Sequence, residues 1–158
     1  MSVTNIVVSG LGGQGVLKVT DILSEVIFTQ GFDVKKSEVH GMSQRGGSVS
    51  SEVRFGAKIN SPMVPAGEAD ILVVLDVTQI EVALSVLKAG GVLITPDDIP
   101  LDQLKNPKAL NIMLLGALSA HLEQLPESAF ITAIENAFPE KLRALNIEMF
   151  NVGRSSRK

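Results

Sequence analysis

The chain has 158 residues, of which 45% are hydrophobic and 4% aromatic, and it contains no cysteine, tryptophan or tyrosine. A chain of this length predicts one domain with an aliphatic core, because about 70% of its unfolded surface can be buried. The net charge of −3 offers no basic face for nucleic acid. The lack of thiols excludes disulfides, a cysteine nucleophile and iron–sulfur clusters held by thiolates of this chain.

The sequence shows no sign of a secretory signal peptide or of a membrane-spanning segment. The N-terminal residues lack the basic region of a signal peptide. The longest clean apolar run, residues 71–75, is too short to cross a bilayer. We therefore expect a cytoplasmic protein that makes no membrane contact.

The first elements predicted along the chain form a strand–helix–strand unit. Residues 5–9 are a short apolar run that ends in glycines, which indicates a buried strand. Residues 16–28 carry apolar side chains at helical spacing, and residues 32–37 read as a second strand. A unit of this kind is expected to cross over right-handed.

The middle of the chain predicts further strands around one helix. Residues 48–55 alternate in polarity, so we expect an antiparallel or edge strand with one solvated face. Residues 58–61 are expected to return as a hairpin arm. A buried strand over 69–75, a helix over 78–88 and a strand over 92–95 follow.

The last third predicts three helices, the first of which is apolar on nearly every side and therefore buried in the domain or against a partner. They span residues 111–122, 127–138 and 140–150. Gly153 is expected to end a single domain of residues 1–153, and the basic residues 154–158 to form a solvated tail. The elements together predict a three-layer α/β, Rossmann-like domain with a mostly parallel sheet and one antiparallel hairpin.

A glycine-rich turn stands between the first expected strand and helix. Gly10, Gly12 and Gly15 satisfy the pattern G-x-G-x-x-G, and Gly13 lies beside them. Such a turn lets the backbone approach a ligand closely and directs N–H groups of the helix start toward an anion. The alternative is a tight crossover that packs closely and receives a phosphate or a partner's carboxylate.

Two nucleotide-binding interpretations of this turn are weakened by the neighbouring residues. Dinucleotide binding requires an acid at the end of the second strand, and the nearest candidate, Glu38, comes later than expected. A P-loop requires Lys and Ser or Thr after the last glycine, where this chain has Val16 and Leu17.

The second candidate segment runs from Glu38 to Ser48 and contains His40 and Arg45 next to the pair Gly46 and Gly47. A guanidinium can hold a phosphate or carboxylate bidentately while two glycines bend around the anion. The alternative for Arg45 is a surface ion pair with a partner. For His40 the alternatives are a loop residue bonded to backbone and a role at a subunit interface or near a substrate.

Other chemistries find little support in the sequence. His40 and His121 are the only histidines, and neither has metal-ligand spacing to a carboxylate, so no metal site is expected. Serine hydroxyls are present, but the G-x-S-x-G elbow of many hydrolases is not.

Residues 37–48, Ser-Glu-Val-His-Gly-Met-Ser-Gln-Arg-Gly-Gly-Ser, resemble the small subunit of 2-oxoacid:ferredoxin oxidoreductases, and most closely that of the indolepyruvate enzymes. The resemblance covers most of the chain. It also includes the Gly10–Gly15 turn, Val53-Arg-Phe-Gly56, Ser61-Pro62, Gly67-Glu-Ala-Asp70 and residues 111–116. The sequence departs from the family pattern in a shorter connection between Pro96 and Asn111.

The resemblance implies a subunit of an enzyme that converts a 2-oxoacid, coenzyme A (CoA) and oxidised ferredoxin to an acyl-CoA, CO₂ and reduced ferredoxin. Thiamine diphosphate, Mg²⁺ and iron–sulfur clusters are expected on a large α subunit, and none on this chain. Alone, this chain is expected to be inactive, and it could form a homodimer. The match at residues 37–42 implies an arylpyruvate substrate.

The resemblance also implies roles for the candidate residues. The Glu38–Gly47 segment would face the large subunit and the substrate or CoA channel, with Arg45 as an anion contact and His40 as a positioning or proton-handling group. Two other hypotheses stay open at this point. They are a free-standing dinucleotide-binding domain and a pure assembly module that contacts no ligand.

Overall fold

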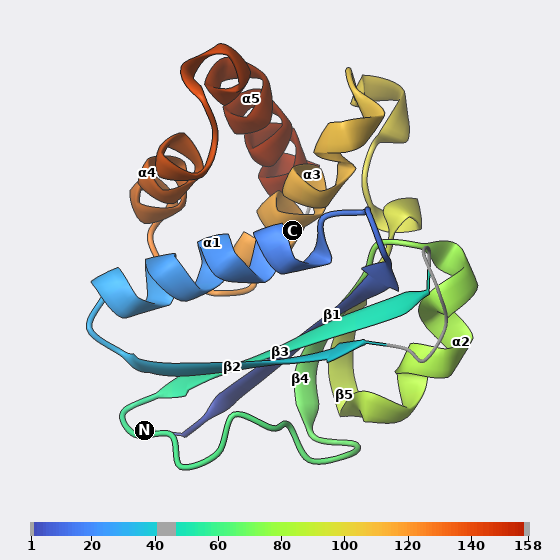
Figure 1. Cartoon of the computed structure of the whole chain (residues 1–158), viewed down its shortest axis with the longest axis vertical. Helices are drawn as coiled ribbons and strands as arrows, with labels where there is room; N and C mark the ends of the chain where they lie inside the picture. The colour runs from blue at the N-terminus through green and yellow to red at the C-terminus, as the bar shows by residue number, and fades with distance from the viewer. Residues whose placement is uncertain (1, 41–46, 157–158) are drawn as a thin grey trace.

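A five-stranded mixed sheet forms the centre of the protein, in the strand order β2-β3-β1-β4-β5. The structure is a computed structural model that describes residues 2–40 and 47–156 (Figure 1). The strands are β1 (Thr4–Leu11), β2 (Asp33–His40), β3 (Ser48–Gly56), β4 (Ala69–Val74) and β5 (Leu87–Ile94). The α-helices are α1 (Val16–Thr29), α2 (Ile80–Ala83), α3 (Leu110–Ser119), α4 (Glu127–Ala137) and α5 (Glu140–Ser156).

The strand pairings confirm the α/β class, but the expected mostly parallel sheet is wrong, and the antiparallel hairpin joins β2 to β3 instead of residues 48–55 to residues 58–61. Strand β1 pairs with β4, and β4 with β5, in parallel. Strand β3 pairs antiparallel with both β1 and β2, so parallel and antiparallel pairs are equally represented. Strands β1 and β2 are therefore parallel to each other, and the connection through α1 passes over the intervening β3.

The expected hairpin arm at residues 58–61 is wrong, because residues 57–68 contain no strand. Side chains from the sheet hold this stretch instead. The Asp33 carboxylate accepts a hydrogen bond from the Ile59 N–H at 2.7 Å, and the Arg54 guanidinium donates to the carbonyl of Ser61 at 2.9 Å. The backbone groups that a hairpin would pair are thus bonded to β2 and β3 side chains.

The expected helix over residues 78–88 is correct only in its first part. The segment is a short helix, α2, between two 3₁₀ turns, Val77–Gln79 and Leu84–Val86. Residues 87 and 88 already belong to β5, where Leu87 pairs with Ala69 of β4. Pairing with β4 overrides the local helical pattern there.

Most of the hydrophobic core lies between the sheet and the four long helices, α1, α3, α4 and α5, which cover one face (Figure 1). Phe130 of α4 stacks on Phe150 of α5 with ring centroids 5.4 Å apart. The opposite face carries a smaller cluster, which includes Val7, Leu72 and Val74 and is covered by residues 77–86 and the loop around Val64. The third layer therefore exists but is thin.

Helices α3 and α5 cross at very close range, and this crossing explains two features of the chain. The described residues 111–119 of α3 are all buried, as its apolar sequence predicts. Gly153 of α5 lies against the Met113 carbonyl, where a Cβ atom would come within 1.8 Å of the oxygen.

The expected end of the ordered part at Gly153 is wrong. Gly153 is a contact point inside α5, which continues to Ser156. Arg154, expected in a solvated tail, instead donates a hydrogen bond to the Ser119 hydroxyl at 2.9 Å. Residues 157 and 158 lie outside the described residues.

Candidate functional site

The candidate site lies at the carboxyl ends of the neighbouring parallel strands β1 and β4. The chain leaves β1 through α1 toward β2 on one side, and leaves β4 through residues 77–86 toward β5 on the other. In open α/β sheets such a switch point leaves a crevice outside the strand ends, where ligands bind. The predicted glycine turn follows β1 directly at this edge.

Two glycines of this turn have backbone angles that disfavour other residues. Gly13 has φ of 90°, and Gly15, which precedes the first residue of α1, has φ of 83°. No atom lies within 4 Å of the position where a Cβ of Gly13 would stand. A hollow of about 310 Å³ lies beside the turn; its lining residues are Leu11, Gly12, Gly13, Gly15, Val16, Leu17, Lys18 and Val49.

Gly10 and Gly15 each make room for an amide side chain of the protein itself. A Cβ on Gly10 would stand 2.9 Å from Oε1 of Gln14. A Cβ on Gly15 would stand 2.3 Å from Nδ2 of Asn111, which donates to the Gly15 carbonyl at 3.2 Å. The outer glycines of the motif therefore serve internal bracing, rather than the approach of a dinucleotide.

Asp76, just beyond β4, is the third group that braces the turn. Its Oδ2 accepts a hydrogen bond from Gln14 Nε2 at 2.7 Å, and Gln14 Oε1 accepts one from the Leu11 N–H at 2.7 Å. Its Oδ1 accepts from the N–H and the hydroxyl of Thr78, at 3.0 and 2.5 Å. Both oxygens of this partly exposed carboxylate are thus occupied.

These hydrogen bonds hold the pKa of Asp76 below its ordinary value of 3.8, with the Thr78 hydroxyl as the largest cause, followed by the Thr78 N–H. Gln14 contributes in the same direction, and desolvation opposes them. The carboxylate is therefore the form that the folded protein favours.

The pKa of Asp76 predicts a pH dependence of stability. Because its folded pKa lies below the unfolded value, its contribution is fully present above the unfolded pKa and is lost as the pH falls through the folded pKa. We expect the stability advantage of the wild type over Asp76→Asn to be constant near neutral pH and to decrease as the pH falls through the folded pKa of Asp76. Urea unfolding across the pH range measures this difference. Glu81→Gln, which removes an exposed carboxylate from the same segment, is the matched control for the loss of one negative charge.

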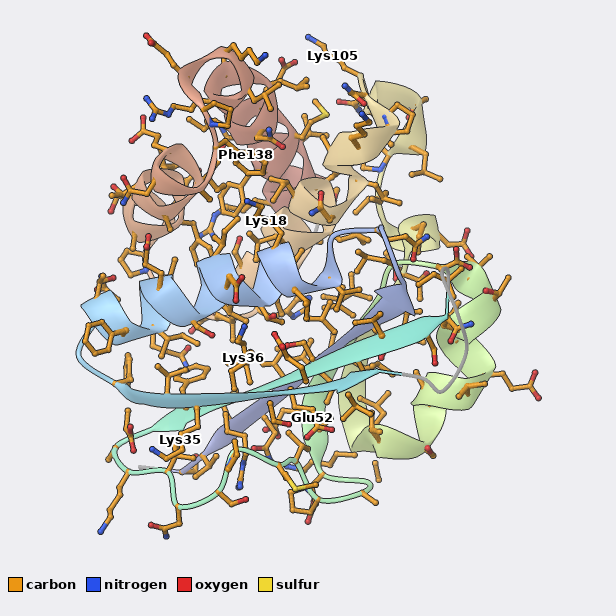
Figure 2. All side chains as sticks on the ribbon, in the orientation of Figure 1. Lys18, Lys35, Lys36, Glu52, Lys105 and Phe138 are labelled. Carbon is orange, nitrogen blue, oxygen red and sulfur yellow. The ribbon has the colours of Figure 1, made fainter. Side chains whose placement is uncertain are left out.

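Lys18 lines the hollow beside the turn, but its charge is used elsewhere. Its ammonium donates to the Ala137 carbonyl at the end of α4 at 3.2 Å and lies 5.0 Å from the centroid of the Phe138 ring (Figure 2). A cation is favoured at a helix C-terminus and over an aromatic face. Lys18 thus links α1 to α4.

Glu38 does not meet the requirement of a dinucleotide site. Its carboxylate accepts a hydrogen bond from Lys36 at 3.1 Å, and Lys36 also pairs with Asp21 of α1. Strand β3 separates β2 from β1, so Glu38 lies one strand farther from the glycine turn than the fingerprint requires. The geometry disfavours the hypothesis of a free-standing dinucleotide-binding domain.

The second predicted segment begins and ends at the same edge of the sheet. His40 is the last residue of β2, opposite Val49 of β3. Gly47 accepts a hydrogen bond from the Gly12 N–H through its carbonyl at 2.8 Å. The structure therefore brings Gly12 and Gly47 together. Arg45 and Gly46, like the His40 side chain, lie outside the described residues.

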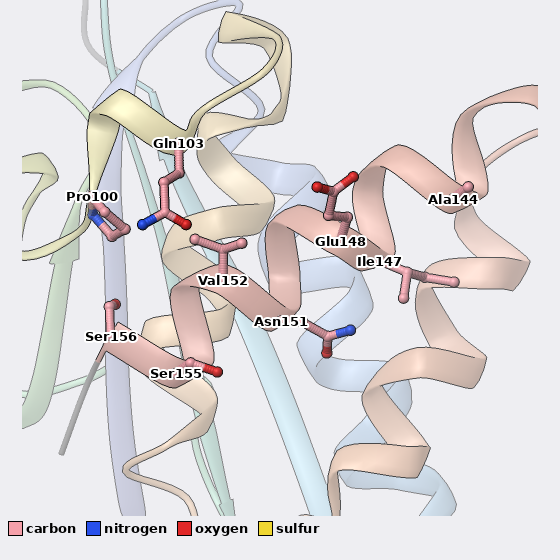
Figure 3. Close-up of a pocket in the computed structure, with 9 residues that line it drawn as sticks. All are labelled: Pro100, Gln103, Ala144, Ile147, Glu148, Asn151, Val152, Ser155 and Ser156. Carbon is pink, nitrogen blue, oxygen red and sulfur yellow. The ribbon is translucent and has the colours of Figure 1, made fainter.

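A larger hollow, of about 730 Å³, lies away from this site (Figure 3). One face of α5 and the connection around Pro100 form its walls. Glu148 at its rim is paired with Lys105 at 2.7 Å. None of the described residues that line it belongs to a strand, so we place the candidate site at the glycine turn.

Two further findings concern residues 2–40 and 47–156. No group of three or more His, Cys, Asp or Glu side chains in these ranges could hold a metal ion. Within the same ranges, none of the helices combines the length and apolar character needed to cross a membrane.

Comparison with known sequences identifies relatives along nearly the whole chain. The family model "Pyruvate ferredoxin/flavodoxin oxidoreductase" matches residues 5–156. "Indolepyruvate oxidoreductase subunit IorB" of Thermococcus kodakarensis is 42% identical over 91 residues, which are 58% of this chain but only 45% of that protein. The IorB subunit of Methanothermobacter thermautotrophicus is 28% identical over 187 residues, covering 94% of this chain and 95% of the relative. The match to the Thermococcus relative thus spans less than half of that protein's length.

A solved structure with the same fold is that of the gamma subunit of a keto/oxoacid ferredoxin oxidoreductase from Geobacter sulfurreducens. It superposes with a TM-score of 0.82 at 25% sequence identity and covers 97% of both chains. Its fold agrees with the α/β sheet described above, and the family model confirms the resemblance drawn from residues 37–48. The chain therefore belongs to the pyruvate ferredoxin/flavodoxin oxidoreductase family.

Proposed function

We propose that this chain is the small, accessory subunit of a 2-oxoacid:ferredoxin oxidoreductase that acts on an arylpyruvate such as indolepyruvate. The observation that carries the proposal is the family match over residues 5–156, joined to relatives named as indolepyruvate oxidoreductase subunits. Catalysis would belong to the cytoplasmic complex and not to this chain alone.

The residues of this chain do not fit the redox cofactors of such an enzyme. It has no cysteine to bind a cluster, and its described residues contain no metal-ligand group. We therefore place thiamine diphosphate, Mg²⁺ and the clusters on a larger partner. Bound there, they supply decarboxylation and electron transfer to ferredoxin. This chain would contribute binding surface and orientation.

We assign anion binding to the edge of the sheet where the glycine turn meets Gly47. The amide groups at the start of α1 favour negative charge, as a phosphate of CoA or a partner's carboxylate would supply. Lys18 is engaged at α4, so the cationic contact is assigned to Arg45. His40, at the end of β2, is assigned a positioning or proton-handling role at the same edge.

The test is an anaerobic co-purification of the tagged chain with its large partner, followed by viologen reduction. We expect a coloured complex that reduces the dye only when both indolepyruvate and CoA are present. The chain alone should be colourless and inactive. Recovery of the chain without a partner, together with tight binding of NAD(P)H or FAD, would overturn the proposal in favour of a dinucleotide-binding domain.

Arg45→Ala is expected to raise the KM for CoA about tenfold or more with assembly intact, because a charge-assisted hydrogen bond is lost. Arg45→Lys should recover part of the affinity, since an ammonium keeps the charge but not the bidentate geometry. His40→Ala should lower kcat. The matched control is Lys58→Ala, which removes an exposed cation from the loop that follows the other end of β3. A pure assembly module would instead show weaker association for Arg45→Ala and an unchanged KM.

A further inference from the structure

A directional chain of hydrogen bonds joins the glycine turn to the end of β4. The Leu11 N–H donates to Gln14 Oε1, and Gln14 Nε2 donates to Asp76 Oδ2, each at 2.7 Å. Asp76 in turn accepts from the N–H of Thr78 at 3.0 Å. The chain spans two segments 62 residues apart in the sequence and crosses the switch point between β1 and β4.

The direction of these bonds is fixed by the groups that take part. A backbone N–H can only donate, so Gln14 must present its oxygen to Leu11 and its NH₂ to Asp76. The Asp76 carboxylate is the only one of the four groups that accepts from both neighbours and donates to neither. Gly10 leaves space for the Gln14 amide, since a Cβ there would stand 2.9 Å from its oxygen.

We infer that Gln14 and Asp76 are positioning residues that fix the glycine turn in the conformation used by the oxidoreductase complex. The inference deepens the proposed function and rests on it. Gly12, Gly13 and Gly15 give the turn wide conformational freedom. The hydrogen bonds that run from Asp76 through Gln14 to the Leu11 N–H form a strut that restrains Leu11. The Gly12–Gly47 hydrogen bond restrains Gly12. Gly13, which has no atom near its Cβ position, is then held in one position beside the hollow.

The test is a four-variant cycle that reverses the polarity of the strut. In Asp76→Asn the side-chain oxygen can still accept the hydrogen bonds of Thr78, because Asn is as good an N-cap residue as Asp. Its amide NH₂ then faces the NH₂ of Gln14, and a flip of Gln14 would only move the clash to the Leu11 N–H. Gln14→Glu places two carboxylates together. In the double variant, Glu at position 14 accepts from both Leu11 and Asn at position 76, so every hydrogen bond is restored.

The cycle is measured on the complex reconstituted with its large subunit, as kcat and KM for CoA in dye reduction with indolepyruvate. Each single variant is expected to raise the KM for CoA about tenfold, with a smaller effect on kcat, and the double variant to return to within about threefold of wild type. Single variants that match the wild type in KM would overturn the inference. A double variant no better than the worse single variant would do the same.

A second measurement keeps the inference separate from the proposed function. Amide exchange of Leu11, followed by NMR in the isolated full chain, should accelerate in both single variants and slow again in the double variant. If the wild-type complex shows no 2-oxoacid-dependent activity, the proposed function is overturned and no role in CoA binding survives. An unchanged Leu11 exchange rate in Asp76→Asn would refute the strut itself.

Discussion

Gly153→Ala is expected to lower the free energy of unfolding by about 3 kcal/mol, because the new methyl group would overlap the α3 backbone. A Cβ at this position would stand 1.8 Å from the Met113 carbonyl oxygen, and backbone cannot rotate away as a flexible side chain could. In an open helix the same change would add stability of about 1 kcal/mol through helix propensity. The clash therefore reverses the sign of the effect. A fall in Tm of roughly 6–12 °C is the corresponding thermal shift.

The reciprocal position offers an independent check of the helix crossing. A Cβ on Gly116 would stand 2.1 Å from the Phe150 carbonyl oxygen, so Gly116→Ala should destabilise the chain similarly. Asn151→Ala, at an exposed position on α5, is the matched control and should change Tm little. If Gly153→Ala were as stable as Asn151→Ala, the close approach of α3 and α5 would be incorrect.

Gly15→Ala is expected to cost about 3 kcal/mol, because it combines two penalties. The first is backbone strain, since φ is 83° at this position. The second is the displacement of the buried Asn111 amide, which would lie 2.3 Å from the new Cβ. Asn111 then loses its bond to the Gly15 carbonyl, and the start of α3 is no longer held against the turn.

Gly13→Ala separates the two penalties of this prediction. Gly13 has a similar φ of 90°, but a Cβ there would meet no atom within 4 Å. It should therefore show only the strain, about 1–2 kcal/mol. Chemical denaturation of the two variants measures the difference. Equal destabilisation of Gly13→Ala and Gly15→Ala would show that the Asn111 amide does not occupy the space beside Gly15.

The periodic segments of the sequence were sufficient to predict most of the fold. Apolar runs and helical stripes predict β1, α1, β4, α3, α4 and most of α5. The errors arise where a distant contact overrides a local pattern. The helical spacing of residues 78–88 continues into a segment that pairs with β4, and Gly153 resembles a helix stop although it is a packing contact with Met113.

The candidate site shows the same limit. The sequence indicates the glycine turn, and the resemblance of residues 37–48 indicates the family. It does not indicate that the outer glycines make room for Gln14 and Asn111, because Asn111 is 96 residues from its partner Gly15. Asp76 could have been suspected from its place directly after a buried strand. Its partner Gln14 could not, since that contact depends on which strands are neighbours.

The pairing of β2 with β3 has a consequence for how the sequence of such a protein can diversify. The ladder of β2 and β3 holds His40 opposite Val49, which places their Cα atoms about 5 Å apart. A connection whose two ends are anchored in this way can gain, lose or exchange residues without a change in strand register. The connection at this edge can therefore evolve independently of the sheet that carries it.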